Sequence, residues 1–284
     1  MPTDALIAVL FGAALHAGWN TAIKTGADTR LDMALVTGGS AAIALALLPV
    51  LPAPDAASVP YLLLSFALQS VYYRLLAAAY RTGDLSHAYP LMRGTAPLLV
   101  AAASGVLLGE ALSATAWTGI LLVCGGVLAI TLGRGRATRR GANGLATTGF
   151  SLANAAVIAS YTVVDGLGVR LSGQPAAYTL WLFLLTGLPL LAAALWRQPR
   201  RLAAYARTRW WVVLGGGACS VGSYGLALWA MTRAPVASAA ALRETSILFA
   251  LLLSRLVLKE RVGPLRLAAG SVIALGAVAM RLPG

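Results

Sequence analysis

Two arginines lie inside long apolar stretches of this chain, where a charged side chain finds few partners. Arg93 lies between Met92 and Gly94, whereas Arg243 follows Leu242 and is directly followed by Glu244. A charge near the middle of a membrane costs at least ~2.5 to 3.5 kcal/mol, so each one needs a partner, a water-filled cavity or a function. A guanidinium is suited to hold a carboxylate. The simpler alternative is that either arginine only caps carbonyl groups or pairs permanently with Glu244.

Glu244 has several candidate roles. On a helix it projects about 100° away from Arg243, so the two side chains cannot satisfy each other in ideal geometry. The carboxylate could pair with Arg93, face a cationic group, or bind a proton that is coupled to transport. The sequence leaves structural pairing and these functional roles open.

Two further helical stripes carry polar side chains. Asn154, Tyr161 and Asp165 recur at i, i+7 and i+11, which indicates one inward polar face. Asp165 is close to the predicted end of its helix, so an interfacial, solvated carboxylate is an equal alternative. The second stripe comprises His16, Asn20 and Lys24, with Trp19 beside it. His16 is a candidate proton site, although a histidine in a polar contact between helices is commoner, and we expect Lys24 to reach the membrane surface.

The composition restricts the class of protein. The 284 residues are 59% hydrophobic and 11% charged, and the mean hydropathy is +0.79, which predicts an integral membrane protein in a lipid bilayer. The net charge of +13 does not indicate nucleic-acid binding, because the arginines punctuate apolar segments. The sequence has neither a Walker loop nor an HExxH motif, so we expect no cofactor, no metal and no direct use of ATP.

Apolar runs bounded by Pro, Gly or charged residues predict ten membrane helices. They cover residues 4–24, 31–51, 59–80, 86–108, 113–132, 144–169, 176–196, 210–232, 235–258 and 264–282. The longest connectors are the basic stretch 133–143 and the stretch 197–209. Glu110 and Glu260, each shortly before a new helix, are expected to be surface-facing turn residues.

The second half of the chain repeats the first at a fixed offset of 150 residues. The offset pairs Arg93 with Arg243 and Glu110 with Glu260, and further pairs are Thr82 with Thr232, Thr95 with Thr245, Ser104 with Ser254 and Gly126 with Gly276. An internal duplication of membrane helices is typical of transporters. Five helices in each half invert the second repeat, so we predict a first repeat at 1–133, a basic linker at 134–143 and a second repeat at 144–284 around a central cavity.

The positive charges predict the orientation in the membrane. Most of the 22 Lys and Arg residues fall in the connectors after helices one, three, five, seven and nine. Because cytoplasmic loops carry the excess of Lys and Arg, we expect these connectors in the cytoplasm and both termini outside.

These motifs resemble the EamA branch of the drug/metabolite transporter superfamily, which includes the YddG-type amino acid exporters. The resemblance rests on Tyr89-Pro90-Leu91-Met92-Arg93-Gly94 with Leu108-Gly109-Glu110, on His16-Ala17-Gly18-Trp19-Asn20 and on Leu242-Arg243-Glu244-Thr245-Ser246. It implies a cavity lined by helices one, three, four, six, eight and nine, with helices five and ten behind. It implies Arg93, Arg243, Glu244, Trp19, Asn20 and Tyr161 as cavity residues, and a multi-pass protein of the bacterial inner membrane. The resemblance implies that both termini lie in the cytoplasm, as they do in many members of the branch. The distribution of Lys and Arg in this sequence predicts the opposite orientation.

The leading hypothesis is a secondary-active or facilitative transporter of small metabolites that works by alternating access, with amino acid export as the best guess. An arginine would hold a carboxylate, Glu244 or Asp165 would face an ammonium group, and aromatic side chains would accept the rest of the solute. Protons are a candidate coupling ion, and the protein would be a monomer or a homodimer. One alternative is an exporter of lipophilic cations or drugs. A remote alternative is a membrane-embedded enzyme, which would need a nucleophile with a base or a metal site, and His16 and His87 are the only histidines of the sequence.

Overall fold

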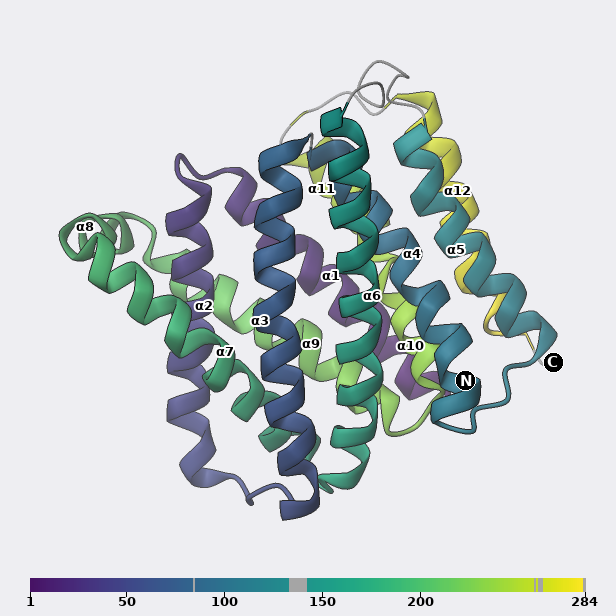
Figure 1. Cartoon of the computed structure of the whole chain (residues 1–284), viewed down its shortest axis with the longest axis horizontal. Coiled ribbons are helices and arrows are strands. Elements are labelled where there is room, and N and C mark those ends of the chain that lie inside the picture. The colour runs from purple at the N-terminus through teal and green to yellow at the C-terminus, as the bar shows by residue number, and fades with distance from the viewer. Residues whose placement is uncertain (84, 133–141, 258, 260–262, 283–284) are drawn as a thin grey trace.

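The computed structural model describes the chain except for residues 84, 133–141, 258, 260–262 and 283–284, and the described residues form helices without any strand (Figure 1). The first half contains α1 (Thr3–Lys24), α2 (Thr29–Leu47), the short turns η1 (Leu48–Val50) and η2 (Ala56–Ser58), α3 (Val59–Thr82), α4 (Leu85–Leu107) and α5 (Ala114–Leu132). The second half contains α6 (Ala142–Leu171), α7 (Pro175–Arg197), α8 (Pro199–Thr208), η4 (Val212–Gly216), α9 (Gly217–Met231), α10 (Val236–Arg243), α11 (Ser246–Leu256) and α12 (Pro264–Ala279).

Each of the ten predicted segments coincides with a helix or with two consecutive helices. Eight segments of the described chain are long and apolar enough to cross a membrane. The other two, α5 and α12, are shorter apolar helices. The helices and their apolar composition confirm the prediction of an all-helical fold with several candidate membrane spans. A helix suits a membrane because it satisfies its own backbone hydrogen bonds in lipid.

The connector at 197–209 contains a helix that the connector prediction did not include. α8 begins with a proline at its first position, where a missing N–H costs nothing. Its Leu202 is buried. Arg201 donates to Asp28 at 2.9 Å, and Arg209 pairs with the buried carboxylate of Asp32 at 2.8 Å. These contacts hold α8 against the start of α2.

The predicted helix at 235–258 is interrupted in its middle. α10 ends at Arg243, and Glu244 and Thr245 form a tight turn in which their N–H groups donate to the carbonyls three residues back, at 3.0 Å and 3.1 Å. α11 then starts at Ser246. Neither Gly nor Pro stands at this point, so local propensity does not explain the break. The break lies at Glu244, whose carboxylate contacts Arg93 of α4. This contact joins segments that are distant in the sequence.

The helices pack in pairs that correspond under the offset of 150 residues. α3 packs on α6 and α1 packs on α9; α4 packs on α6 and α1 packs on α11. Two further close pairs, α2 with α7 and α5 with α12, each join equivalent helices of the two halves. Figure 1 shows α2 and α7 together at one side of the bundle and α5 and α12 at the other.

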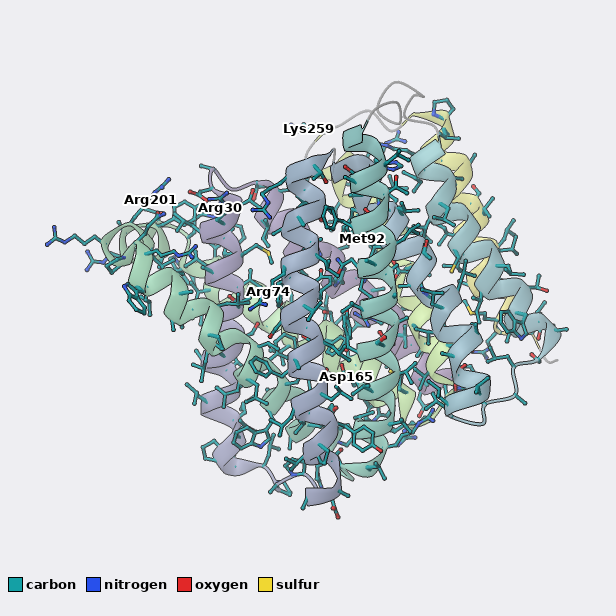
Figure 2. All side chains as sticks on the ribbon, viewed as in Figure 1. Arg30, Arg74, Met92, Asp165, Arg201 and Lys259 are labelled. Carbon is teal, nitrogen blue, oxygen red and sulfur yellow. The ribbon has the colours of Figure 1, made fainter. Side chains whose placement is uncertain are left out.

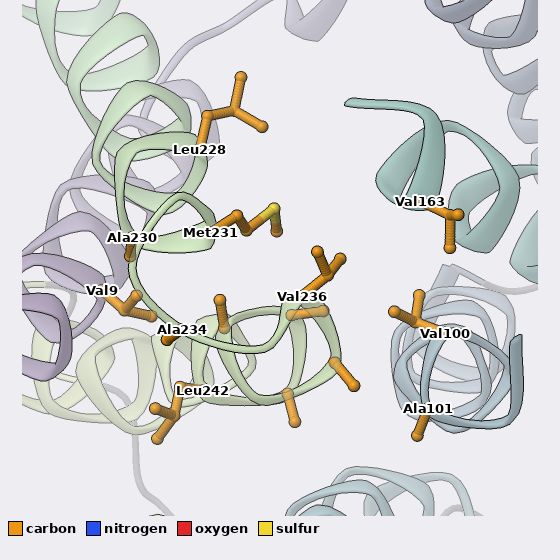
Figure 3. Packing of buried hydrophobic residues seen from close by; sticks show 14 of the residues in the cluster. Val9, Val100, Ala101, Val163, Leu228, Ala230, Met231, Ala234, Val236 and Leu242 are labelled. Atoms are coloured by element: carbon orange, nitrogen blue, oxygen red, sulfur yellow. The ribbon is translucent and has the colours of Figure 1, made fainter. Parts of the chain in front are cut away.

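α10 lies at the centre of the largest apolar cluster. All its residues from Val236 to Leu242 are buried, and a helix that is apolar on every side must be surrounded. Val236 and Leu242 belong to the same cluster as Val9 of α1 and Val100 of α4 (Figure 3). This packing fixes the end of α10, where Arg243 begins the break.

Small residues allow α5 and α12 to touch. A methyl group added at Gly119 would lie 2.3 Å from the Met280 Cγ atom and 2.7 Å from the Gly276 carbonyl oxygen. Conversely, a methyl group at Gly276 would lie 2.7 Å from the Gly119 carbonyl oxygen. Lipid offers no hydrophobic drive between helices, so close backbone approach supplies the attraction.

We therefore expect Gly119→Ala to destabilise the protein by about 1 to 3 kcal/mol, because the two backbones must separate. Gly125→Ala on the same helix is the matched control, since a methyl group there meets nothing within 4 Å. The thermal unfolding midpoint in detergent measures the difference. Equal midpoints for the two variants would contradict the close packing of α5 and α12.

Glu110 lies in the turn between α4 and α5 as expected, but its side chain does not face the surface and is only 10% exposed. Its carboxylate accepts the Val236 N–H at 2.9 Å and pairs with Arg170 at 2.5 Å. Arg170 also donates to the carbonyls of Met231 at 2.8 Å and Ala234 at 3.1 Å. A negative charge at the start of α10 offsets the positive end of that helix. Glu260, the equivalent residue of the second half, lies outside the described residues.

Replacing Glu110 by glutamine removes the charge that holds Arg170 and the start of α10. We expect a loss of about 1.5 to 3 kcal/mol of stability, the range for hydrogen bonds to charged groups. Asp4→Asn is the control, because Asp4 pairs with Arg233 at an exposed site, where ion pairs contribute about 0 to 1 kcal/mol. Chemical denaturation of both variants in detergent measures the comparison, and a Glu110→Gln loss no larger than that of Asp4→Asn would rule out this role.

Candidate functional site

An ion pair joins the two halves of the chain at the break after α10. The Arg93 Nε atom of α4 lies 2.9 Å from the Glu244 Oε2 atom, and the two side chains are only 12% and 4% exposed. A second nitrogen of Arg93, Nη2, is buried and has no hydrogen-bond partner among the described residues. The pairing of Glu244 with Arg93 is the structural alternative that the sequence left open. It leaves one donor of Arg93 unused.

A small cavity lies beside this pair. Its lining comes from α4, α6, α10 and the break, and comprises Arg93, Ala96, Pro97, Val100, Ile158, Thr162, Ala240, Arg243 and Glu244. The volume is about 10 Å³, which is room for a single water molecule. Arg93 and Arg243, which are equivalent under the offset of 150 residues, therefore line the same cavity. The cavity has no room for anything larger than water.

Arg243 has no carboxylate partner within the part of the chain that the structure describes. Its guanidinium carbon lies 4.7 Å from the centre of the Tyr224 ring of α9. A cation over an aromatic face is stabilised by roughly 0.5 to 2 kcal/mol, which is less than the cost of a charge in a membrane. The positive charge of Arg243 is thus held in place but not neutralised.

Asp165 is fully buried on α6, so the alternative of a solvated carboxylate at the helix end is wrong. Its Oδ1 atom accepts the Tyr178 hydroxyl at 3.0 Å, and its Oδ2 atom accepts the Tyr224 hydroxyl at 2.5 Å. Figure 2 shows Asp165 within the outline of the bundle, whereas Arg201 reaches outward from α8. Tyr224 therefore contacts Arg243 with its ring and Asp165 with its hydroxyl.

The rest of the polar stripe on α6 is also buried. Tyr161 is 9% exposed and meets the edge of Tyr72 on α3, with ring centres 6.0 Å apart. Asn154 donates to the Met92 sulfur at 3.3 Å. An inward polar face on α6 was the prediction, and these positions agree with it.

The candidates on α1 and at the start of α4 are not among the residues that line the cavity, although His16 and Tyr89 lie near enough to interact with the charges of Arg93 and Arg243. His16 and Trp19 touch edge to face at 5.1 Å, and Asn20 donates to the His16 carbonyl at 2.8 Å. Trp19 packs against an apolar cluster that contains Ile23, and its indole N–H is buried with no hydrogen-bond partner in the described part of the chain. Tyr89 is half-buried, one turn before Arg93. The binding roles of these four residues stay predictions.

Sequence reasoning missed two residues of the site. Tyr178, near the start of α7, is fully buried, although its place at a helix end is typical of an aromatic anchor at the membrane surface. Thr162 lines the cavity one residue after Tyr161. Tyr178 could have been found from the sequence, because it follows Asp165 by 13 residues across the short turn between α6 and α7. Two residues at that spacing can face each other when consecutive helices pack side by side.

Comparison with known proteins identifies the family. A sequence model of the EamA-like transporter family matches residues 147–282, in the second half of the chain, and this match places the protein in the drug/metabolite transporter superfamily. It is a membrane transporter of small molecules.

The fold has solved relatives. One crystal structure aligns with a TM-score of 0.77 over 98% of this chain and 96% of the other, at 17% sequence identity. At that identity the comparison supports a shared fold alone. No curated protein matches the chain in sequence.

The Arg93–Glu244 pair can be tested by a double-mutant cycle. Removing one partner leaves the other charge buried and unpaired, so we expect Arg93→Gln and Glu244→Gln each to lower stability by about 3 to 5 kcal/mol. The double variant should recover much of this loss, because two neutral amides can pair. Thermal or chemical unfolding of the three variants measures the coupling energy. Additive losses would mean that the two side chains do not interact.

Proposed function

We propose that this protein exports amino acids or closely similar zwitterionic metabolites. The observation that carries the proposal is the Arg243 guanidinium, which lines the cavity and has no carboxylate partner among the described residues. A membrane protein retains such a charge where a solute supplies the missing partner. The planar, forked guanidinium fits a carboxylate better than any other side chain does.

The other groups of the cavity complete a zwitterion site. Glu244 supplies the carboxylate that would face an ammonium group. Its ion pair with Arg93 would weaken when the ammonium group binds. Apolar residues of the lining, such as Val100 and Ile158, would contact the side chain of the solute. The cavity thus offers both charge signs within one apolar enclosure.

Alternating access between two inverted five-helix repeats is the proposed mechanism. The support is the packing between the halves, in which α3 on α6 corresponds to α9 on α1, and α4 on α6 corresponds to α11 on α1. The interrupted helix at Arg243–Glu244 also supports it, because broken helices at a repeat interface commonly form transport sites. With a cavity of only about 10 Å³, a solute can enter only when the helices around it separate.

We further propose the predicted boundaries and orientation. The family match at 147–282 agrees with a second repeat at 144–284 after a linker at 134–143 and a first repeat at 1–133. The starts of α1 and α6 lie at opposite ends of the bundle (Figure 1), as an inverted repeat requires. With the basic connectors in the cytoplasm, both termini lie outside the bacterial inner membrane.

The alternative of a lipophilic cation or drug as the solute is less well supported. It requires Glu244 and Asp165 to face the cavity with both arginines neutralised elsewhere. Asp165 is absent from the lining residues, and Arg243 brings an uncompensated positive charge to them, which would repel a cation. The remote alternative of a membrane-embedded enzyme has no support from the family, whose members are transporters.

Transport in proteoliposomes tests the proposal. We expect the purified protein to exchange radiolabelled phenylalanine but not the lipophilic cation tetraphenylphosphonium. Arg243→Gln should lower the affinity for phenylalanine about ten- to a hundredfold, because a hydrogen-bonded charge contributes about 1.5 to 3 kcal/mol, and Arg93→Gln should also impair transport. Arg233→Gln, at an exposed ion pair, is the control. Unchanged exchange in both the Arg93 and Arg243 variants would refute the assignment, and exchange of the cation alone would favour the alternative.

A further inference from the structure

Asp165 is unusual among the buried carboxylates of the described chain. The other two are Asp32, which pairs with Arg209 at 2.8 Å, and Glu244, which pairs with Arg93. Asp165 is 0% exposed and forms no ion pair with any described residue. It is surrounded by hydroxyl groups and not by cations.

Three helices supply these hydroxyl groups. Tyr178 of α7 and Tyr224 of α9 each bind one oxygen of Asp165. The Ser65 hydroxyl of α3 also lies near Asp165. Gln69 donates to the Ser65 oxygen at 3.1 Å, so the Ser65 proton remains available. The charged and titratable groups around Asp165 are therefore Tyr178, Tyr224, Arg243 behind the Tyr224 ring, and Tyr161 on its own helix.

This environment suits both protonation states. The hydroxyl donors of Tyr178 and Tyr224 stabilise the carboxylate anion, whereas burial without a cation in direct contact disfavours it. A protonated carboxyl donates one hydrogen bond and still accepts others, and a hydroxyl group can turn from donor to acceptor. No partner of Asp165 must break away when a proton arrives, unlike an arginine in an ion pair.

Tyr224 connects this group to the cavity. Its hydroxyl donates to Asp165 at 2.5 Å, while Arg243 rests on its ring. When Asp165 is ionised, it is the anion that partly offsets the Arg243 charge across the ring. When Asp165 is protonated, that offset disappears, and Arg243 attracts the carboxylate of a solute more strongly.

We propose that Asp165 is a proton-binding site linked through Tyr224 to solute binding at Arg243, so that a proton and a carboxylate solute move together. The proposal rests on the proposed function, because it assumes a carboxylate at Arg243. Linkage is reciprocal, so a bound solute must also favour the proton on Asp165. Outward flow of the solute down its own gradient would then carry protons with it.

The experiment compares two modes of transport in proteoliposomes. Phenylalanine counterflow at equal pH measures solute exchange, and a trapped pH-sensitive dye measures protons that move when phenylalanine is added outside. In the wild type we expect internal acidification that accompanies phenylalanine entry. Asp165→Asn should keep counterflow within about threefold and lose the acidification. Asp165→Glu, which restores a titratable group, should recover it, and Asp4→Asn at an exposed ion pair should behave as the wild type.

Several results would overturn the proposal. These are acidification that persists in Asp165→Asn, alkalinisation in the wild type, no pH change in a wild type that exchanges phenylalanine, and equal loss of both modes in a folded Asp165→Asn protein. If Asp165→Asn does not fold, Asp165→Ser is the second neutral variant, since a serine can still bond to the tyrosines.

A spectroscopic readout separates this proposal from the proposed function. The infrared difference spectrum between acid and alkaline pH should show a carboxylic acid C=O band that is retained in Glu244→Gln and absent from Asp165→Asn or Asp165→Ser. A wild type that fails to exchange phenylalanine but shows this band would contradict amino acid transport and retain the proton site. A spectrum without the band would overturn the proton site itself.

Discussion

The ion pair between Arg93 and Glu244 is the interaction on which the rest of the site depends. It crosses from the first half of the chain to the second, in a part of the molecule where both side chains are largely buried and loss of either partner leaves the other charge uncompensated. The carboxylate reaches Arg93 at the turn between α10 and α11, where the helix is interrupted. The cost of two buried charges is thus met by one contact, which also places Arg243 beside the cavity.

The helices could be predicted because the membrane imposes a local rule. Each spanning segment must be long, apolar and internally hydrogen-bonded, and each of these properties is visible in a single stretch of sequence. The segment 59–80, for example, differs from α3 (Val59–Thr82) by two residues at one end. The repeat offset was equally visible in the sequence. It pairs Arg93 with Arg243 and predicts that both arginines lie near one central cavity.

The parts that sequence reasoning missed all depend on contacts between distant segments. Glu110 stands in a turn in the sequence, but its carboxylate binds the start of α10, 126 residues further on. The break at Glu244 lacks the Gly or Pro that would reveal it, and the partner of Tyr178 is identified only once α6 and α7 are packed together. Pattern and composition describe one helix at a time, so they cannot predict which of several buried charges will meet.

The three buried carboxylates of the described chain show how the same cost can be met in different ways. An arginine neutralises Asp32 at the start of α2 and Glu244 at the cavity, and each such pair is stable only while both charges remain. Hydroxyl groups around Asp165 stabilise its charge without fixing it, because they can serve a neutral carboxyl as well. An arginine partner therefore suits a carboxylate that must stay ionised, whereas hydroxyl partners suit one that changes its charge. In a transporter the second kind is useful where a second ion must be bound and released, and Asp165 lies one tyrosine away from the unneutralised Arg243. The distribution of arginines among these carboxylates thus separates the two that must stay ionised from the one that can change its charge during transport.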